Sequence, residues 1–175
     1  MINMEETIRI PDERIGVLIG PNGTTKRQIM KRTNTKIVVD SKEGEVTITG
    51  EGEEYFKASD IVKAIGRGFS PIRAFRILEG DYLLKIITIV EYTGKSRGAQ
   101  EAKRGRVIGK DGIARREIEK KTSSLISVYG KTVTIIATPD NLEQATQAVE
   151  LLLQGSSHDT MGNFLERKGK TRFEL

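Results

Sequence analysis

The chain has 175 residues and a mass of 19.5 kDa, which allows one large domain or two small ones. Hydrophobic residues make up 37% and charged residues 30% of it, a balance that excludes disordered and membrane-embedded classes. There is no cysteine and only one histidine, so a disulfide framework and a Cys/His metal site are excluded. Because the acidic start has no apolar signal core, we expect a cytoplasmic protein without membrane attachment.

The first half alternates short strand and helix patterns. Residues 6–10 alternate as a strand, and Pro11-Asp12 opens a short helix that ends at a Gly20 loop. A second helix is expected over Thr24–Thr33. Two β-rich segments follow, residues 35–40 and 45–50, and apolar residues then recur at helical spacing over 53–69. The predicted order is β-α-α-β-β-α.

The second half repeats this order. Residues 81–92 are expected to form the opening strand, and a basic segment leads to a Gly109 loop. A helix is predicted over Ile113–Thr122, followed by strands at 125–130 and 131–137. A final helix begins at Pro139 and is stopped by Gly155.

A shift of 89 residues superposes Ile19-Gly20-x-x-Gly23 on Ile108-Gly109-x-x-Gly112. An internal duplication with a domain-sized period explains this match better than a solenoid does. We therefore predict an α+β protein with two tandem domains. The expected boundaries are 1–70 for the first domain, 71–80 for a linker, 81–157 for the second domain and 158–175 for a C-terminal tail.

Positive charge is concentrated in the two copies. Residues 20–36 contain five basic and no acidic side chains, and residues 94–121 contain ten basic and four acidic ones. The overall charge is only +5, so the rest of the chain is net acidic. One such run is usually a solvated helix face, but two at equivalent positions of a repeat favour a polyanion partner.

The repeated Gly-x-x-Gly loop suits a phosphodiester backbone. Glycine permits a tight turn and close approach of another chain, and the second glycine precedes a helix whose free N–H groups favour an anion. The following helix and strand would supply an apolar floor for bases. This arrangement resembles the K-homology (KH) module of type I, which holds about four nucleotides of single-stranded nucleic acid.

The two loops differ in chemistry. The second contains Lys110, which can reach a phosphate directly, whereas the first has no charge and Pro21 removes one backbone donor. The first loop is therefore expected to bind more weakly, through its helix dipole and Lys26. The alternative is a structural first domain that supports the second.

Three further stretches carry a closer resemblance: "GFSPIRAFRILEGDYLLKIITIVEYTGK", "KRGRVIGKDGIARREIEKKTSSLISVYGKTVTII" and "AVELLLQGSSHDTMGNFLE". They resemble the short, archaeal-type form of the Partner of Nob family of small-subunit ribosome assembly factors. The resemblance implies a non-catalytic ribosome assembly and rRNA-processing factor that binds the 3′ region of small-subunit ribosomal RNA. It also implies a PIN-domain endonuclease as partner, beside other ribosome assembly or translation proteins.

Loop chemistry and resemblance together give the candidate RNA-binding residues, with no cofactor or metal expected. In the first copy they are Gly20, Pro21, Asn22, Gly23, Lys26 and Arg27. In the second copy they are Arg104, Arg106, Ile108, Gly109, Lys110, Asp111, Gly112, Ile113, Arg115, Arg116, Ile126 and Val128.

Three alternatives to this function stay open at this point. Asp111, Glu117 and Glu119 lie close enough in sequence for a metal-dependent nuclease, but Glu117 and Glu119 do not share a helix face and suit surface ion pairs with neighbouring basic residues. A protein-interaction scaffold would use Met161, Phe164 and Leu165 for docking, although packing on their own domain is the commoner outcome. A general RNA-binding regulator is the remaining alternative.

Overall fold

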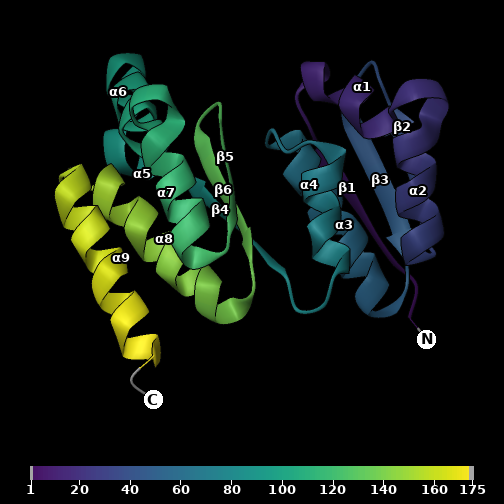
Figure 1. Ribbon diagram of the computed structural model, residues 1–175. Coiled ribbons are helices and arrows are strands. Elements are labelled where there is room, and N and C mark those ends of the chain that lie inside the picture. Colours follow the sequence, from purple (N-terminus) through teal and green to yellow (C-terminus); the bar gives the residue numbers. More distant parts are fainter. Residues whose placement is uncertain (1, 174–175) are drawn as a thin grey trace. The chain divides into compact units, whose positions relative to one another are not determined.

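The computed structural model describes residues 2–173, which divide into two compact units, the first ending at Gly80 and the second beginning at Asp81 (Figure 1). Each unit has a three-stranded antiparallel sheet and helices, and each follows the predicted β-α-α-β-β-α order. The α+β prediction is thereby confirmed. Among the described residues, none of the helices combines the length and apolar character that crossing a bilayer requires.

Unit 1 has the sheet order β1-β3-β2, so β2 is an edge strand. Its elements are β1 (Met4–Arg9), α1 (Asp12–Ile19), the short 3-10 turn η1 (Pro21–Gly23), α2 (Thr24–Thr33), β2 (Lys36–Asp40), β3 (Glu45–Gly50), α3 (Gly52–Gly66), α4 (Pro71–Ala74) and η2 (Phe75–Leu78). Alternate residues of β3 are buried, and they meet a continuous apolar stripe on α3. Leu18, Ile29, Ile48, Ile61 and Ile65 are fully buried in this core.

Within residues 71–80, predicted as a linker, α4 and η2 take up positions 71–78 and pack on α3 of unit 1. The Ser70 hydroxyl accepts a hydrogen bond from the Arg73 amide and caps α4, whose first residue is proline. Ala74 and Ile77 are fully buried. The segment is too short to show helical periodicity in the sequence, which is why it reads as a linker.

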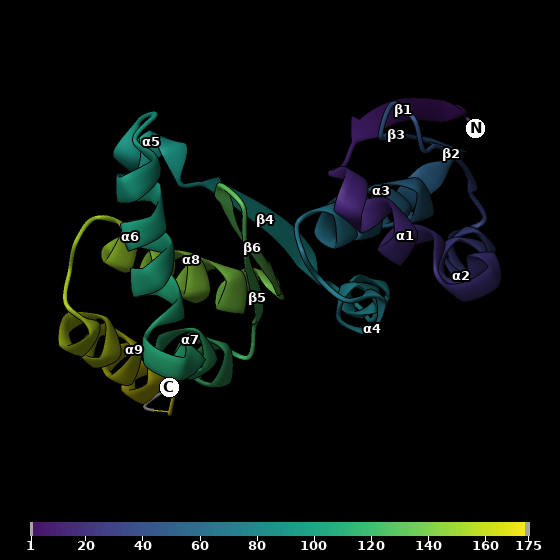
Figure 2. The ribbon, with the colours of Figure 1, turned by 90° about the horizontal axis from the view of Figure 1, so that it is seen from above.

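Unit 2 has the sheet order β4-β6-β5, so β5 is the edge strand that corresponds to β2. Its elements are β4 (Leu83–Thr88), α5 (Val90–Thr93), α6 (Arg97–Ile108), η3 (Lys110–Gly112), α7 (Ile113–Thr122), β5 (Leu125–Tyr129), β6 (Thr132–Ala137), α8 (Pro139–Leu153) and α9 (His158–Phe173). Figure 2 shows α6, α7 and α8 on one side of this sheet.

The opening strand of unit 2 is shorter than the predicted 81–92. It ends at Thr88, since Ile89 already has helical backbone angles and Val90–Thr93 form the one-turn helix α5. Ile89 is fully buried, and Tyr92 packs against the same core. A run of apolar residues cannot distinguish a strand from a buried helical turn, so the sequence overestimates the strand.

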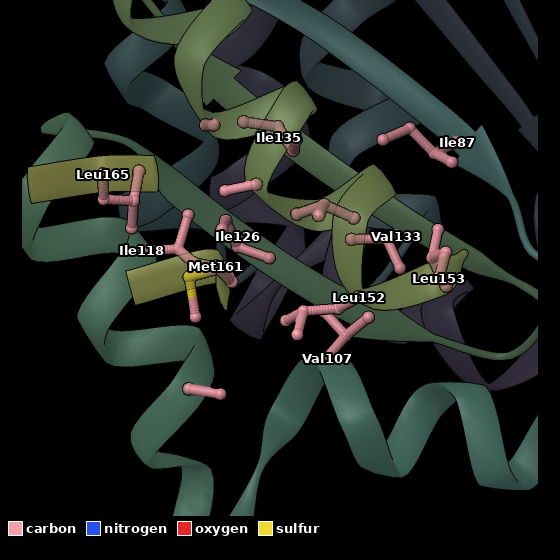
Figure 3. Packing of buried hydrophobic residues seen from close by; sticks show 14 of the residues in the cluster. Ile87, Val107, Ile118, Ile126, Val133, Ile135, Leu152, Leu153, Met161 and Leu165 are labelled. Atoms are coloured by element: carbon pink, nitrogen blue, oxygen red, sulfur yellow. The ribbon is translucent and has the colours of Figure 1, made fainter. Parts of the chain in front are cut away.

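Residues 158–175, predicted as a tail, contain α9, which packs against α7 and α8. Met161 is fully buried and Leu165 is 4% exposed, and both belong to the core cluster of unit 2 (Figure 3). Phe164 is partly buried and packs against this cluster. The apolar stripe of this segment thus packs mainly within its own unit. Outside this core, Lys121 Nζ lies 2.9 Å from Glu166 Oε1, a hydrogen bond that raises the pKa of Lys121 and lowers the pKa of Glu166.

Candidate nucleic-acid interface

The first Gly-x-x-Gly loop joins α1 to α2 through a turn that needs glycine. Gly20 has φ 75° and ψ 172°, and a Cβ there would overlap with the Thr25 hydroxyl group. Asn22 and Gly23 both have left-handed backbone angles, with φ of 53° and 74°. The backbone therefore turns twice within four residues and delivers the chain to the first residue of α2.

The second loop has the same backbone conformation. Gly109 has φ 74° and ψ 174°, Asp111 has φ 54°, and Gly112 has φ 74°. A Cβ at Gly109 would lie 2.7 Å from the Cβ of Ala114. The corresponding angles agree within a few degrees although the two middle residues differ, so the geometry is a property of the loop.

Each loop ends at the N-terminus of a ten-residue helix, α2 or α7. No side chain caps either helix, and neither first turn contains an acidic residue. The first N–H groups of a helix have no intrahelical partner and lie at the positive end of its dipole, so each loop presents donors to an anion.

Cations flank the first loop in two ways. Arg27 Nη1 donates a 2.6 Å hydrogen bond to the Asn22 carbonyl, so this guanidinium braces the loop and remains exposed beside it. Lys26 lies one residue earlier on α2, half-buried, and forms no ion pair with any residue in the range 2–173. Lys26 and Arg27, both predicted to bind RNA, thus lie next to the first loop.

The second loop has more charge at its surface. Lys110 and Asp111 are exposed within the turn. Arg116, also exposed, extends over Gly112, where its Nη1 would lie 2.9 Å from a Cβ at that position. A phosphate at this loop would meet a lysine and an arginine besides the backbone donors.

The structure places two predicted arginines away from the loop. Arg106 donates to the carbonyl groups of Leu152, Gly155 and Ser156 and thereby holds the C-terminal end of α8. Arg104 donates a 3.0 Å hydrogen bond to the Gly130 carbonyl at the β5–β6 turn. Arg106 is a structural residue of unit 2, because helix-terminal carbonyls need such donors.

The apolar floor of the second groove also differs from the expectation. Ile113, the first residue of α7, is 57% exposed, and Ile108 is half-buried at the other side of the loop. Ile126 is only 2% exposed and belongs to the core cluster, against which Val128 also packs. Since side chains alternate along β5, the inward residue Ile126 can offer a ligand only its backbone.

Sequence reasoning missed one acidic residue at this site. Glu119 was treated as a surface ion-pair residue, and its carboxylate indeed lies 2.7 Å from Arg115 Nη1. The same carboxylate also accepts a 2.9 Å hydrogen bond from the Ile126 amide, at the edge of β5. The i,i+4 spacing predicts the ion pair between Arg115 and Glu119. The contact of Glu119 with β5 depends on the tertiary structure and cannot be predicted from that spacing.

Two of the three carboxylates considered for a nuclease are engaged in ion pairs: Glu117 lies 3.2 Å from Lys121, and Glu119 pairs with Arg115. The third, Asp111, is exposed in the loop. Over the described range 2–173, no three acidic, histidine or cysteine side chains are grouped so as to hold a metal ion.

Comparison with known proteins identifies both units. A family model described as "Eukaryotic type KH-domain (KH-domain type I)" matches residues 83–170, and a "KH domain" model matches residues 5–64. A KH domain-containing protein of Methanocaldococcus jannaschii is 42% identical, over 97% of this chain and 78% of its own length.

Solved structures from archaea are similar over nearly the whole chain. Dim2p from Pyrococcus horikoshii is 47% identical with a TM-score of 0.87, covering 94% of this chain and 99% of its own. A second structure from that organism, described as an a/eIF2alpha-aDim2p-rRNA complex, matches with 46% identity and a TM-score of 0.90, over 97% of this chain and 96% of the matched one. A protein of unknown function from Aeropyrum pernix is 36% identical with a TM-score of 0.92, covering 99% and 95%.

Proposed function

This chain belongs to the Partner of Nob (Dim2-type) family of KH-domain proteins, and on that premise we propose that it binds single-stranded RNA through its two Gly-x-x-Gly loops. The observation that carries the proposal is the geometric identity of the loops, each placed before a basic helix with no acidic residue in its first turn. A phosphodiester backbone would lie against the loop donors, with Lys110 and Arg116 beside it in unit 2.

The RNA we propose is the 3′ region of small-subunit ribosomal RNA. Support comes from the aDim2p of the rRNA complex, which is 46% identical to this chain over nearly its full length. The role would be that of a non-catalytic assembly and rRNA-processing factor in the cytoplasm. A translation factor of the a/eIF2alpha kind and a PIN-domain endonuclease are the proposed protein partners, the latter on family resemblance alone.

The second loop is proposed to dominate. Lys110 supplies a direct charge, whereas Pro21 at the equivalent position has neither charge nor backbone N–H. The first loop would contribute through its helix dipole and Lys26. Two weak sites on one chain reinforce each other through effective concentration, so the first loop need not bind tightly alone to matter.

Fluorescence anisotropy with a labelled strand and its duplex tests this function. We expect the single strand to bind more tightly, since a KH groove holds unpaired bases, and log affinity to fall linearly with log salt, by about 0.7 for each phosphate contact. A scrambled strand of equal length measures the contribution of sequence. Equal binding of single strand and duplex would contradict the proposal. It would indicate a basic surface that binds any polyanion.

A further inference from the structure

The two grooves differ at the strand that faces the bases. β2 and β5 are the edge strands of their sheets and pair on one side only, so alternate residues direct their backbone N–H and C=O groups to the open side. Ile37 and Ile126 are equivalent in register, pairing with Ile48 and Ile135. A nucleobase edge also carries adjacent hydrogen-bond donors and acceptors, so it can pair with the exposed N–H and C=O groups of such a strand.

In unit 2 both backbone groups of Ile126 are already engaged by α7. The amide donates to Glu119 Oε2 at 2.9 Å, and the carbonyl accepts from Arg115 Nη1 at 3.5 Å. Arg115 and Glu119 are also joined to each other at 2.7 Å. A carboxylate and a guanidinium therefore cover the strand edge at this residue, and their side chains remain 14% and 25% exposed.

Unit 1 has different residues at the same places. Met30 stands at the position of Glu119 and Lys26 at that of Arg115. Within residues 2–173, no side chain forms a hydrogen bond to the backbone of Ile37. The first groove thus presents the strand edge itself, and the second presents a charged pair in front of it.

We infer that Glu119, held by Arg115, is a base-selecting residue of the second groove that favours cytosine over uracil; this rests on the proposed RNA-binding function. A carboxylate only accepts hydrogen bonds, and its two oxygens offer about four acceptor sites; Arg115 and Ile126 are among the partners of Glu119. The N4 amino group of cytosine donates to such an acceptor, while the guanidinium donates to a ring acceptor.

Uracil has the opposite pattern at the same atoms. It presents a carbonyl oxygen where cytosine has its amino group, and an acceptor facing a carboxylate is repelled. The two pyrimidines have nearly the same shape and differ at the group on C4 and at N3, which accepts a hydrogen bond in cytosine and donates one in uracil, so hydrogen bonds at these atoms separate them. A negative side chain is also compatible with the base side of a groove, where no phosphate has to approach it.

The experiment compares short oligocytidine and oligouridine strands by anisotropy. The second groove is isolated in a Pro21→Asp/Asn22→Asp background, which places negative charge in the first loop. The cytidine-to-uridine affinity ratio is measured with Glu119 intact, with Glu119→Met (the residue that unit 1 carries) and with Glu119→Gln. We expect the ratio to fall by at least about fivefold in both variants. The amide of Glu119→Gln still accepts from Ile126 and also donates to uracil.

A reciprocal variant checks the same idea in the other groove. Met30→Glu, in a Lys110→Asp background, should raise the cytidine-to-uridine ratio of the first groove. The inference is overturned if the cytidine-to-uridine affinity ratios change by less than about twofold while both Glu119 variants melt like the parent. Arg115 and Glu119 would then only cover the edge of β5 without selecting a base. If the parent binds neither strand, RNA binding itself fails, which is a different result.

Discussion

Lys110→Asp is expected to weaken single-stranded RNA binding by roughly tenfold to a hundredfold. Lys110 is exposed at the first middle position of a loop whose backbone donors and helix dipole favour an anion. A charge-assisted hydrogen bond contributes about 1.5–3 kcal/mol, which corresponds to that range of affinity. The variant also places two adjacent carboxylates in the loop, because Asp111 follows. Anisotropy titrations of both proteins at one salt concentration measure the difference.

Lys95→Asp is the matched control for this prediction. It makes the same charge change in the same unit, at an exposed residue before α6, whereas Lys110 follows that helix. Twelve helical residues separate the two positions by about 18 Å. Affinity should change little in Lys95→Asp. An equal loss in both variants would mean that net charge, and not the loop, holds the RNA.

Met161→Ala is expected to lower the stability of unit 2 by about 2–5 kcal/mol. The Met161 side chain is fully buried between α9 and the helices it covers, so truncation leaves a cavity in the core cluster. For a domain of this size, each kcal/mol shifts the melting temperature by roughly 4–8 °C. Thermal unfolding followed by circular dichroism measures the shift.

Asn163→Ala provides the comparison for the helix itself. Asn163 lies on the exposed side of α9, and surface substitutions usually change stability by no more than about 0.5 kcal/mol. It should melt close to the parent. If Met161→Ala also melts within a degree or so of the parent, α9 does not belong to the cooperative core and its packing carries no stability.

The repeat made most of the fold predictable. The helices over Thr24–Thr33 and Ile113–Thr122 have the bounds that the sequence indicates, because glycine precedes each one and a left-handed residue follows it. The helices outside the repeat match were not predictable in the same way. Residues 71–80 are too short for periodicity, and α9 buries mainly two side chains, a weak signal beside many charges.

The parts of the candidate site that depend on local backbone chemistry were predictable from the sequence. The parts that depend on tertiary contacts were less predictable. The loops and Lys110 follow from glycine spacing and charge alone. Arg106 could not be separated from the groove arginines by sequence, since its partners are carbonyl groups about 50 residues away. Glu119 was missed for the same reason, because its contact with Ile126 exists only once α7 lies beside β5.

RNA binding by the two loops can be observed residue by residue through amide chemical-shift perturbation, with the full chain titrated by a strand matching the small-subunit 3′ end. We expect the largest changes at the amides of residues 109–113, with smaller changes at residues 20–24. Amides of α9 should remain unchanged. Changes confined to α9, or spread evenly over basic residues while both loops stay unaffected, would contradict RNA binding by the Gly-x-x-Gly loops.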